Sequence, residues 1–211
     1  TAELWPYART GGLGQAVAGL AKFQASSGTE SHVLLPLYRQ ARAHAGRLEL
    51  LCDPFAVESA GRREEVRCWR TADASYPKPL FLEHDASFDR PGIYGDANGD
   101  SPDNSRRFAL LASAAIEIAR RLGDSNLILH AHDWHAAMAL VYLRSLLSRH
   151  PYYRRVPAVL SVHNAGYQGH FPPSTMPEIG LPWELFNWEY LEWYNKVNWL
   201  KGGIISADAV V

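Results

Sequence analysis

The chain has 211 residues, of which 47% are hydrophobic and 20% are charged, and this composition excludes a disordered or fibrous protein. Its formal net charge of −1 gives no electrostatic reason to expect nucleic acid or an anionic membrane as a partner, and no apolar run approaches the roughly 20 residues of a spanning helix. The two cysteines, Cys52 and Cys68, are too few for a disulfide scaffold or a thiolate zinc site, although a single bridge between them stays open. We therefore expect a cytoplasmic domain with no nucleic-acid and no membrane partner.

The first segment predicts the second half of a βαβ unit. A glycine-rich turn at residues 11–14 opens a helix with apolar residues at helical spacing, Gly28 ends it, and residues 32–36 are typical of a buried strand. Such a turn normally follows a strand, and residues 1–7 are too few to supply one. The end of the chain, residues 204–211, stops within an apolar β-like run. We therefore expect the natural protein to begin earlier, with its first strand absent from this chain, and to continue further.

The middle of the chain predicts a change of pattern followed by a long helix. Between residues 48 and 85, short alternating segments separated by Gly, Pro and charged residues indicate a small antiparallel excursion. Residues 89–104, rich in Gly, Pro, Asp and Asn, are expected to form a long loop. A helix should follow, with Asp103 or Asn104 as its N-cap and Gly123 as its stop.

The second half alternates strand and helix. A strand is expected at 127–129, a helix at 134–148 and a strand at 158–162. Residues 171–201, dense in Trp, Tyr and Glu, are expected to form one or two amphipathic helices before a final strand at 204–205. The whole pattern predicts an α/β fold, a Rossmann-like doubly wound sheet that is mostly parallel.

Three polar clusters follow predicted strands or open predicted helices. In such folds ligands bind at the carboxyl ends of the strands, so their convergence at one edge predicts a functional site. The clusters are Arg9 to Gly14, His130 to His135, and His163 to Gly169.

The glycine cluster has two open interpretations. The missing Cβ atoms of Gly11 and Gly12 let backbone N–H groups approach a ligand, and the following helix N-terminus favours an anion such as a phosphate. A tight turn without a chemical role is the alternative, because the glycine order matches neither the dinucleotide fingerprint nor the phosphate loop. Arg9, directly before the turn, favours anion binding.

The histidine cluster resembles a metal site only at first sight. His130, His132 and His135 match no zinc-binding helix motif and no cysteine joins them, so no metal is expected. Asp133 and Trp134 are expected to form the turn from strand to helix. Asp133 would then either cap the helix or accept hydrogen bonds from sugar hydroxyls.

The third cluster favours a functional loop. His163 follows a buried strand and should emerge at the rim of the sheet, where a lone histidine can also be structural. Its neighbours Asn164, Tyr167 and Gln168 provide several hydrogen-bonding groups beside two glycines, which favours function. The aromatic stretch 183–199 is interpreted as core and surface helix rather than as a carbohydrate platform.

Together the three clusters resemble bacterial glycogen synthases and plant starch synthases, which are glucosyltransferases of the GT-B fold. The similarity continues in order through residues 89–92, 103–108 and 198–209. It implies transfer of glucose from a nucleotide sugar, usually ADP-glucose, to the non-reducing end of an α-1,4-glucan with retention of configuration. It also implies a cleft between two Rossmann-like domains, no cofactor and no metal, and a plastid location if the source is a plant. Residues 1–211 would then be the N-terminal, acceptor-side domain, inactive by itself because the C-terminal nucleotide-sugar domain is absent.

The resemblance also implies roles for single residues. Arg9 stands where the family has a Lys near the donor's phosphates, and Gly11 with Gly12 would supply backbone donors there. His163 would be the catalytic residue beside the reacting sugar, where fixed dipoles can stabilise an oxocarbenium-like transition state. The remaining substrate-binding residues would be Asp133, Asn164, Tyr167 and Gln168. An Arg and a Lys of the other domain would assist the departing diphosphate.

Three positions depart from the family pattern: Arg9 for Lys, Gln15 for Asp, and Ser101 for Tyr. They leave two other interpretations open. One is a diverged glucan-binding or regulatory domain without catalysis, and the other is a GT-B glycosyltransferase with a different donor.

Overall fold

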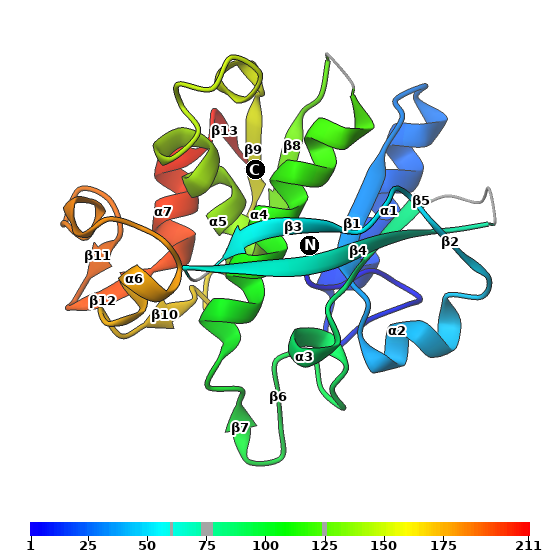
Figure 1. The fold of residues 1–211 in the computed structure, drawn as a ribbon, viewed down its shortest axis with the longest axis horizontal. Coiled ribbons are helices and arrows are strands. Elements are labelled where there is room, and N and C mark those ends of the chain that lie inside the picture. The colour runs from blue at the N-terminus through cyan, green and yellow to red at the C-terminus, as the bar shows by residue number, and fades with distance from the viewer. Residues whose placement is uncertain (60, 73–77, 124–125) are drawn as a thin grey trace. The chain divides into compact units, whose positions relative to one another are not determined.

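The structure is a computed structural model that describes residues 1–59, 61–72, 78–123 and 126–211 (Figure 1). The chain divides into two compact units. The first comprises residues 1–56 and 65–102, and the second comprises residues 57–64 and 103–211. Each unit is described by itself.

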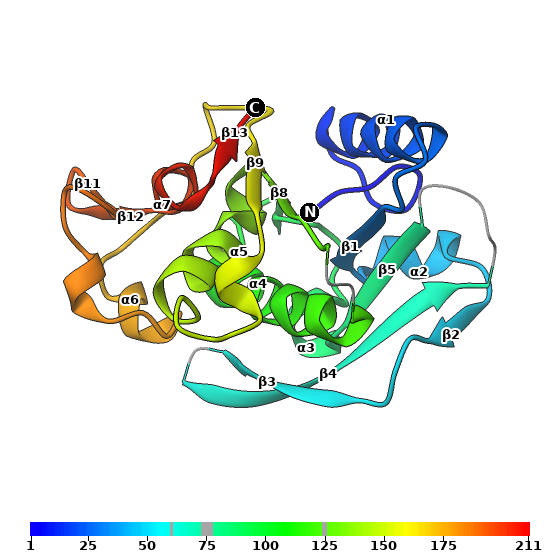
Figure 2. The ribbon, with the colours of Figure 1, turned by 90° about the horizontal axis from the view of Figure 1, so that it is seen from above.

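The first unit is built on a mixed sheet with the strand order β1-β5-β4-β2 (Figure 2). β1 (His32–Pro36) pairs in parallel with β5 (Lys78–Glu83), with Leu34 opposite Leu80. β5 is antiparallel to β4 (Arg62–Thr71), which is antiparallel to β2 (Leu48–Leu50). β3 (Phe55–Ser59) also pairs with β4. The predicted antiparallel excursion is confirmed.

The helices of the first unit begin with α1 (Leu13–Ser26), which buries an apolar face containing Leu13, Val17 and Ala21. Gly28 follows it with a φ of 81°, a left-handed conformation that favours glycine, so the predicted stop is confirmed. The other small elements are α2 (Arg39–His44), α3 (Asp85–Phe88), β6 (Gly95–Asp96) and β7 (Gly99–Asp100). Cys52 and Cys68 are both free thiols, and burial raises the pKa of Cys68 to about 12.

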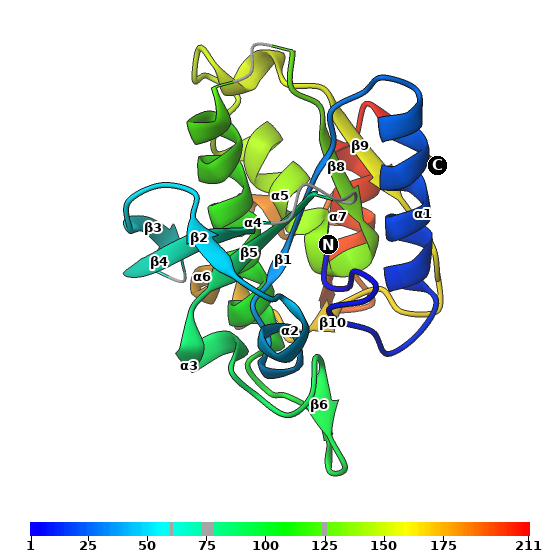
Figure 3. The same ribbon diagram turned by 90° about the vertical axis from the view of Figure 1, so that its right-hand side faces the viewer.

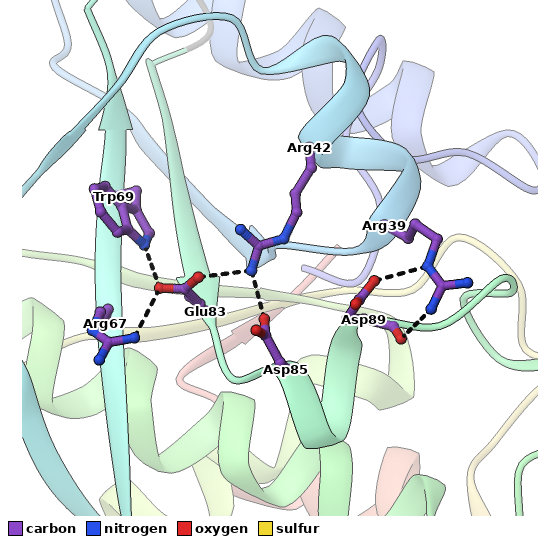
Figure 4. A network of polar contacts seen from close by, with 7 residues as sticks. All are labelled: Arg39, Arg42, Arg67, Trp69, Glu83, Asp85 and Asp89. Carbon is purple, nitrogen blue, oxygen red and sulfur yellow. Dashed lines mark hydrogen bonds and ion pairs between the residues drawn. The ribbon is translucent and has the colours of Figure 1, made fainter.

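A network of polar contacts ties α2 to β4, β5 and α3 (Figure 4). Arg42 of α2 donates to the carboxylates of Glu83 and Asp85, and the indole Nε1 of Trp69 donates to Glu83 at 2.9 Å. Burial by itself raises the pKa of Glu83, but the hydrogen bonds from Arg42 and Trp69 outweigh it and hold that pKa below its usual range. Further charged members of the network are Arg39, Arg67 and Asp89.

The second unit contains a parallel sheet with the strand order β13-β9-β8 (all three strands are labelled in Figure 1, and β8 and β9 in Figure 3). Its strands are β8 (Leu129–His132), β9 (Ala158–Ser161) and β13 (Ala209–Val210). The helices packed in this unit are α4 (Asn104–Leu122), α5 (Asp133–Ser145) and α7 (Trp199–Ser206). Short elements complete it: η1 (Tyr153–Arg155), α6 (Thr175–Glu178), η2 (Trp183–Leu185), and an antiparallel sheet of β10 (His170–Phe171), β12 (Lys196–Asn198) and β11 (Glu192–Trp193).

The α/β class is therefore confirmed, and so are most predicted elements of the second unit. α4 ends at Gly123, whose φ is 72°. β8 begins two residues later than predicted, and α5 ends three residues earlier. In the described parts of the chain, no helix has both the length and the apolar character needed to cross a membrane.

Two predictions for the last forty residues are wrong. Residues 171–198 form two short helical turns, loops and a small antiparallel sheet instead of amphipathic helices, and residues 199–201 begin α7. Prolines explain this, because each lacks a backbone N–H and restricts the residue before it; they stand at Pro172, Pro173, Pro177 and Pro182. The final strand was expected at Ile204 and Ile205, but both lie in α7.

Local contacts explain why α7 forms there. The side chain of Asn198 accepts a hydrogen bond from the backbone of Lys201 and so caps the helix. Within α7, a Cβ on Gly202 would lie 2.4 Å from Leu191 and 3.1 Å from Val141 of α5, and one on Gly203 would lie 2.7 Å from Ala137 of α5. The two glycines therefore let α7 approach α5 closely, and this packing overrides the β-propensity of the following isoleucines.

Candidate functional site

In the second unit, the turn from β8 into α5 brings Asp133 to the loop that follows β9. Asp133 has a φ of 56°, a left-handed conformation that is uncommon for a residue other than glycine. Its Oδ1 accepts hydrogen bonds from the backbone N–H of His163 at 2.7 Å and of Asn164 at 3.3 Å. The N-cap position of α5 is His132, and no side chain caps that helix. Asp133 therefore holds the His163 loop, and the interpretation of Asp133 as a helix cap is wrong.

Three imidazoles line up across β8 and the end of β9. His130 and His132 stack with ring centroids 4.3 Å apart, and Nδ1 of His132 lies 3.0 Å from Nε2 of His163. Nε2 of His130 lies 2.8 Å from Oγ of Ser161. The parallel register explains this alignment, because His132 lies opposite Ser161 and side chains two residues apart on a strand share a face.

Burial disfavours the charged form of three histidines of this region, His130, His132 and His135. Burial lowers the pKa of His132 to about 2, and it lowers the pKa values of His130 and His135 below their usual range. Within the residues that the structure describes, no group of three or more His, Cys, Asp or Glu side chains is arranged to hold a metal ion. The rings instead bond and stack with one another, while His163 at the end of the row is exposed.

The loop from His163 to His170 is braced by its own polar groups. Oδ1 of Asn164 accepts from the backbone of Gly166 at 2.9 Å, which is a local turn typical of Asn. Gln168 donates through Nε2 to the carbonyl of Ala165, and its Oε1 accepts from Nδ2 of Asn198 at 2.7 Å. Both polar atoms of the Gln168 side chain are thus used within the protein.

Gly169 lets this loop pass close to α5 and α7. Its φ is 64°, and a Cβ there would lie 2.5 Å from the indole ring of Trp134. Its carbonyl accepts from the backbone of Trp199 at 3.1 Å. Tyr167, in contrast, points its ring into solvent with 70% of the residue exposed.

In the first unit, a buried carboxylate organises the glycine loop. Oε2 of Glu3 accepts from the backbone N–H of Thr10 at 2.8 Å and of Gly11 at 3.3 Å. Oε1 accepts from the hydroxyls of Thr10 at 2.7 Å and Tyr94 at 2.6 Å. Burial raises the pKa of Glu3, but these hydrogen bonds outweigh it and hold the pKa below its usual range. Glu3 is therefore ionised and holds the glycine loop in place through these hydrogen bonds.

The glycines of this loop differ in their surroundings. Gly11 and Gly12 are exposed, and a Cβ on either would meet no atom within 4 Å. Gly14 is buried, and a Cβ on it would lie 3.0 Å from the carbonyl oxygen of Ala8 and 3.2 Å from the nitrogen of Trp5. Arg9 is exposed and its guanidinium lies over the ring of Trp5 at 5.2 Å. The loop thus presents open backbone and one cation, while Gly14 serves packing.

The predicted site residues fall into two groups. Asp133, His163, Asn164 and Gln168 are brought together in the second unit by the hydrogen bonds described above, with exposed Tyr167 in the same loop. Arg9, Gly11 and Gly12 belong to the first unit. Two of the departures from the family pattern, Gln15 and Ser101, also lie in the first unit.

Three residues with a positioning role were missed by sequence reasoning: Glu3, His132 and Asn198. Glu3 lies in a segment judged too short to be a strand, and its partners stand up to ninety-one residues away. His132 was noticed only as a member of an apparent metal cluster. The one available signal was its even spacing from His130, which predicts a shared strand face.

Comparison with known proteins decides the family. Residues 1–211 match the family described as the starch synthase catalytic domain. The chain belongs to this family. It is 36% identical over 210 residues to a glycogen synthase of Anaeromyxobacter dehalogenans and 33% identical over 208 residues to one of Syntrophotalea carbinolica. In both comparisons the alignment covers 99% of this chain and 43% of the relative.

A solved structure gives the same result. The chain superposes with a TM-score of 0.83 and 26% identity on the catalytic domain of Starch Synthase IV from Arabidopsis thaliana bound to ADP and acarbose. The match covers 99% of this chain and 43% of that structure. The family expected from the three clusters is thus confirmed. The chain spans less than half the length of the relatives it matches.

Proposed function

We propose that this chain is the N-terminal, acceptor-side half of a retaining glucosyltransferase that moves glucose from ADP-glucose to the non-reducing end of an α-1,4-glucan. The observation that carries the proposal is the exposed His163 loop, held by Asp133 through two backbone N–H groups and by His132 through a ring nitrogen. A site that is rigid inside and open outside is what transition-state stabilisation by fixed dipoles requires. The neighbouring structure with ADP and acarbose supports the donor and the glucan class.

His163 is proposed as the catalytic residue that touches the reacting glucose. Its neutral neighbours keep the site free of a competing cation, and the Asp133 carboxylate fixes its backbone. Oxocarbenium-like charge that develops on the sugar would be stabilised by these fixed groups without a metal. Asn164 and Tyr167 would contribute further sugar contacts, whereas Gln168 is proposed to act through the loop that it braces.

The glycine loop is proposed to bind the phosphates of the donor. Arg9 is exposed and can pair with a phosphate, and the backbone of Gly12 is open to a ligand. Because Glu3 already accepts from the N–H of Gly11, we assign the donor role to the N–H of Gly12 rather than to both glycines. The Arg9 guanidinium takes the place of the ammonium group expected in this family.

The full protein is proposed to contain more than this domain. A second domain that holds the nucleotide and supplies the Arg and Lys for the departing diphosphate would account for the unmatched length of the relatives. A strand before Thr1 is also proposed. It is supported by the amine of Thr1, which donates a hydrogen bond to the carbonyl of Leu34 in β1 at 3.0 Å. We place the protein in the cytoplasm, or in a plastid if its source is a plant.

The test is glucose transfer by the full-length protein, measured as incorporation into glycogen from ADP-glucose and from UDP-glucose. We expect transfer, faster with ADP-glucose, and a loss of at least about 100-fold in the His163→Ala variant. His44→Phe, which removes an exposed histidine of α2, serves as the matched control and should leave the rate unchanged. Residues 1–211 alone should show no transfer. Absence of transfer from either donor, or full activity of His163→Ala, contradicts the proposal.

A further inference from the structure

The two ring nitrogens of His163 have different surroundings. Nε2 lies 3.0 Å from Nδ1 of His132, which is a hydrogen bond in which one nitrogen donates and the other accepts. This contact occupies Nε2 of His163. Nδ1 is therefore the ring nitrogen that is left to meet a ligand.

His132 is itself held in place by its neighbours. Its ring is buried and stacks on the ring of His130 with an interplanar angle of 27°. His130 in turn is held by Oγ of Ser161, which lies opposite His132 in the parallel register of β8 and β9. His132 cannot turn away from His163 without breaking this stack.

The charge state of His132 also restricts the hydrogen bond that it makes with His163. Burial lowers its pKa to about 2, so the ring is neutral at any physiological pH. A neutral imidazole presents its Nδ1 either as an N–H donor or as a lone pair, but not as both. The tautomer of His132 and the tautomer of His163 are therefore coupled through their shared hydrogen bond.

We propose that His132 is a positioning residue for His163: its Nδ1 holds Nε2 of His163, orients that ring, couples the tautomers of the two rings, and leaves Nδ1 of His163 facing the sugar. His132 does not touch the substrate and acts only through His163. The assignment of the sugar as the ligand rests on the proposed function, whereas the pairing of the two rings does not. In the sequence, His132 stands out only as part of an apparent metal cluster.

Substitutions at His132 can separate the hydrogen bond from the shape of the ring. His132→Phe keeps an aromatic ring for stacking on His130 but removes the nitrogen. His132→Asn places an amide near the position of Nδ1 and so keeps the hydrogen bond while losing the stack. If His132→Phe does not fold, His132→Gln replaces it. The glutamine amide reaches the position of Nε2 of His132 instead of Nδ1, so this variant also loses the hydrogen bond to His163. His44→Phe is the control for loss of a histidine elsewhere.

The first measurement is the tautomer of His163, read from the 15N shifts of its ring in full-length protein without substrate and assigned with His163→Ala. We expect the ratio of the two His163 tautomers to differ between the wild type and His132→Phe, because the phenyl ring has no atom that can bond to Nε2 of His163. Equal tautomer ratios in the wild type and His132→Phe overturn the proposal.

The second measurement is the kinetics of glucose transfer. We expect kcat to fall by about 10- to 100-fold in His132→Phe while KM for ADP-glucose changes little, with most of the rate recovered in His132→Asn. Equal losses in His132→Phe and His132→Asn would indicate a merely structural role and overturn the proposal. If the wild type transfers no glucose, the proposed function fails, and the tautomer measurement still decides whether His132 controls His163.

Discussion

The region around His163 and the glycine loop are built in opposite ways. Around His163, side chains bond to one another: Asp133 holds the loop backbone and His132 holds the ring. In the glycine loop, Gly11 and Gly12 face open space, and one buried carboxylate, Glu3, organises the turn from within. The difference is the reason for our proposal that the first region positions a side chain for chemistry, while the second keeps backbone accessible for an anion.

The largest effect expected from this comparison concerns Asp133. Asp133→Ala removes the acceptor for the N–H groups of both His163 and Asn164, so the loop loses its anchor and two donors lose their partner. We expect glucose transfer by the full-length protein to fall by about 100-fold. Asp133→Asn retains an acceptor oxygen and should fall much less. Equal losses in the two variants would show that the charge, and not the hydrogen bond, holds the loop.

Gly169 tests whether the His163 region depends on close packing. Gly169→Ala would place a methyl group 2.5 Å from the ring of Trp134 at a φ of 64°, so we expect the free energy of unfolding to fall by about 2–4 kcal/mol. The measurement is urea denaturation at neutral pH. Gly180→Ala is the matched control, because Gly180 has a φ of 73° but no neighbour within 4 Å of a Cβ. A loss no larger than that of the control would contradict the packing argument.

On acidification, the two regions are expected to lose stability at different pH values. The folded protein keeps His132 neutral to about pH 2, and the unfolded chain binds that proton below pH 6.5. Unfolding therefore takes up a proton, so this contribution is complete above pH 6.5 and falls by about 1.4 kcal/mol per pH unit below it. Glu3, in contrast to the neutral His132, is ionised in the folded protein. Its pKa is lowered in the folded state, so its contribution is complete above its unfolded pKa of 4.5 and is lost only below that value.

The measurement for this prediction is the free energy of unfolding between pH 7.5 and pH 5, a range that lies above the unfolded pKa of Glu3 and in which the His132 contribution should change. We expect the His132→Phe variant to show a shallower slope than the wild type by roughly one proton. Glu3→Gln should leave the slope in this window unchanged. A wild-type slope that His132→Phe does not alter would contradict the burial of a neutral His132.

The smallest effects are expected within the glycine loop. Gly14→Ala brings a methyl group to 3.0 Å from the carbonyl of Ala8, and we expect a loss of about 1–2 kcal/mol in the free energy of unfolding. Gly12→Ala meets no neighbour and should change stability by less than about 0.5 kcal/mol. In the full-length protein, Gly12→Ala should instead raise KM for ADP-glucose. Similar stability losses at both positions would contradict the distinction between Gly14, which is needed for close packing, and Gly12, which faces open space.

Most of the fold could be predicted because local signals agreed with tertiary contacts. α1, α4 and their glycine stops followed from helical spacing and from the left-handed conformation at Gly28 and Gly123. The strand expected at Ile204 and Ile205 failed because an Asn198 cap and the close approach of two glycines favour a helix there. The Asn198 cap is a local contact, but Ala137, which packs on Gly203, comes from a distant part of the chain, so local composition alone does not reveal the helix.

The site could be predicted in part for the same reason. Asp133 and His163 stand next to strand ends, and that position alone marks them as candidates. The partners that hold them became visible only when β8 and β9 were aligned, since the register sets His132 opposite Ser161. Glu3 could not be recognised because its hydrogen bond to Tyr94 joins residues 91 positions apart, and its bonds to the glycine loop depend on the turn that the loop makes in the folded chain.

The most direct test of the account is a crystal structure of the full-length protein with ADP and a non-hydrolysable malto-oligosaccharide. We predict a sugar hydroxyl within about 3.2 Å of Nδ1 of His163, with Nε2 still bonded to His132 and Oδ1 of Asp133 still bonded to the backbone of His163. A sugar bound away from the His163 loop, or His163 turned so that Nε2 leaves His132, would contradict it.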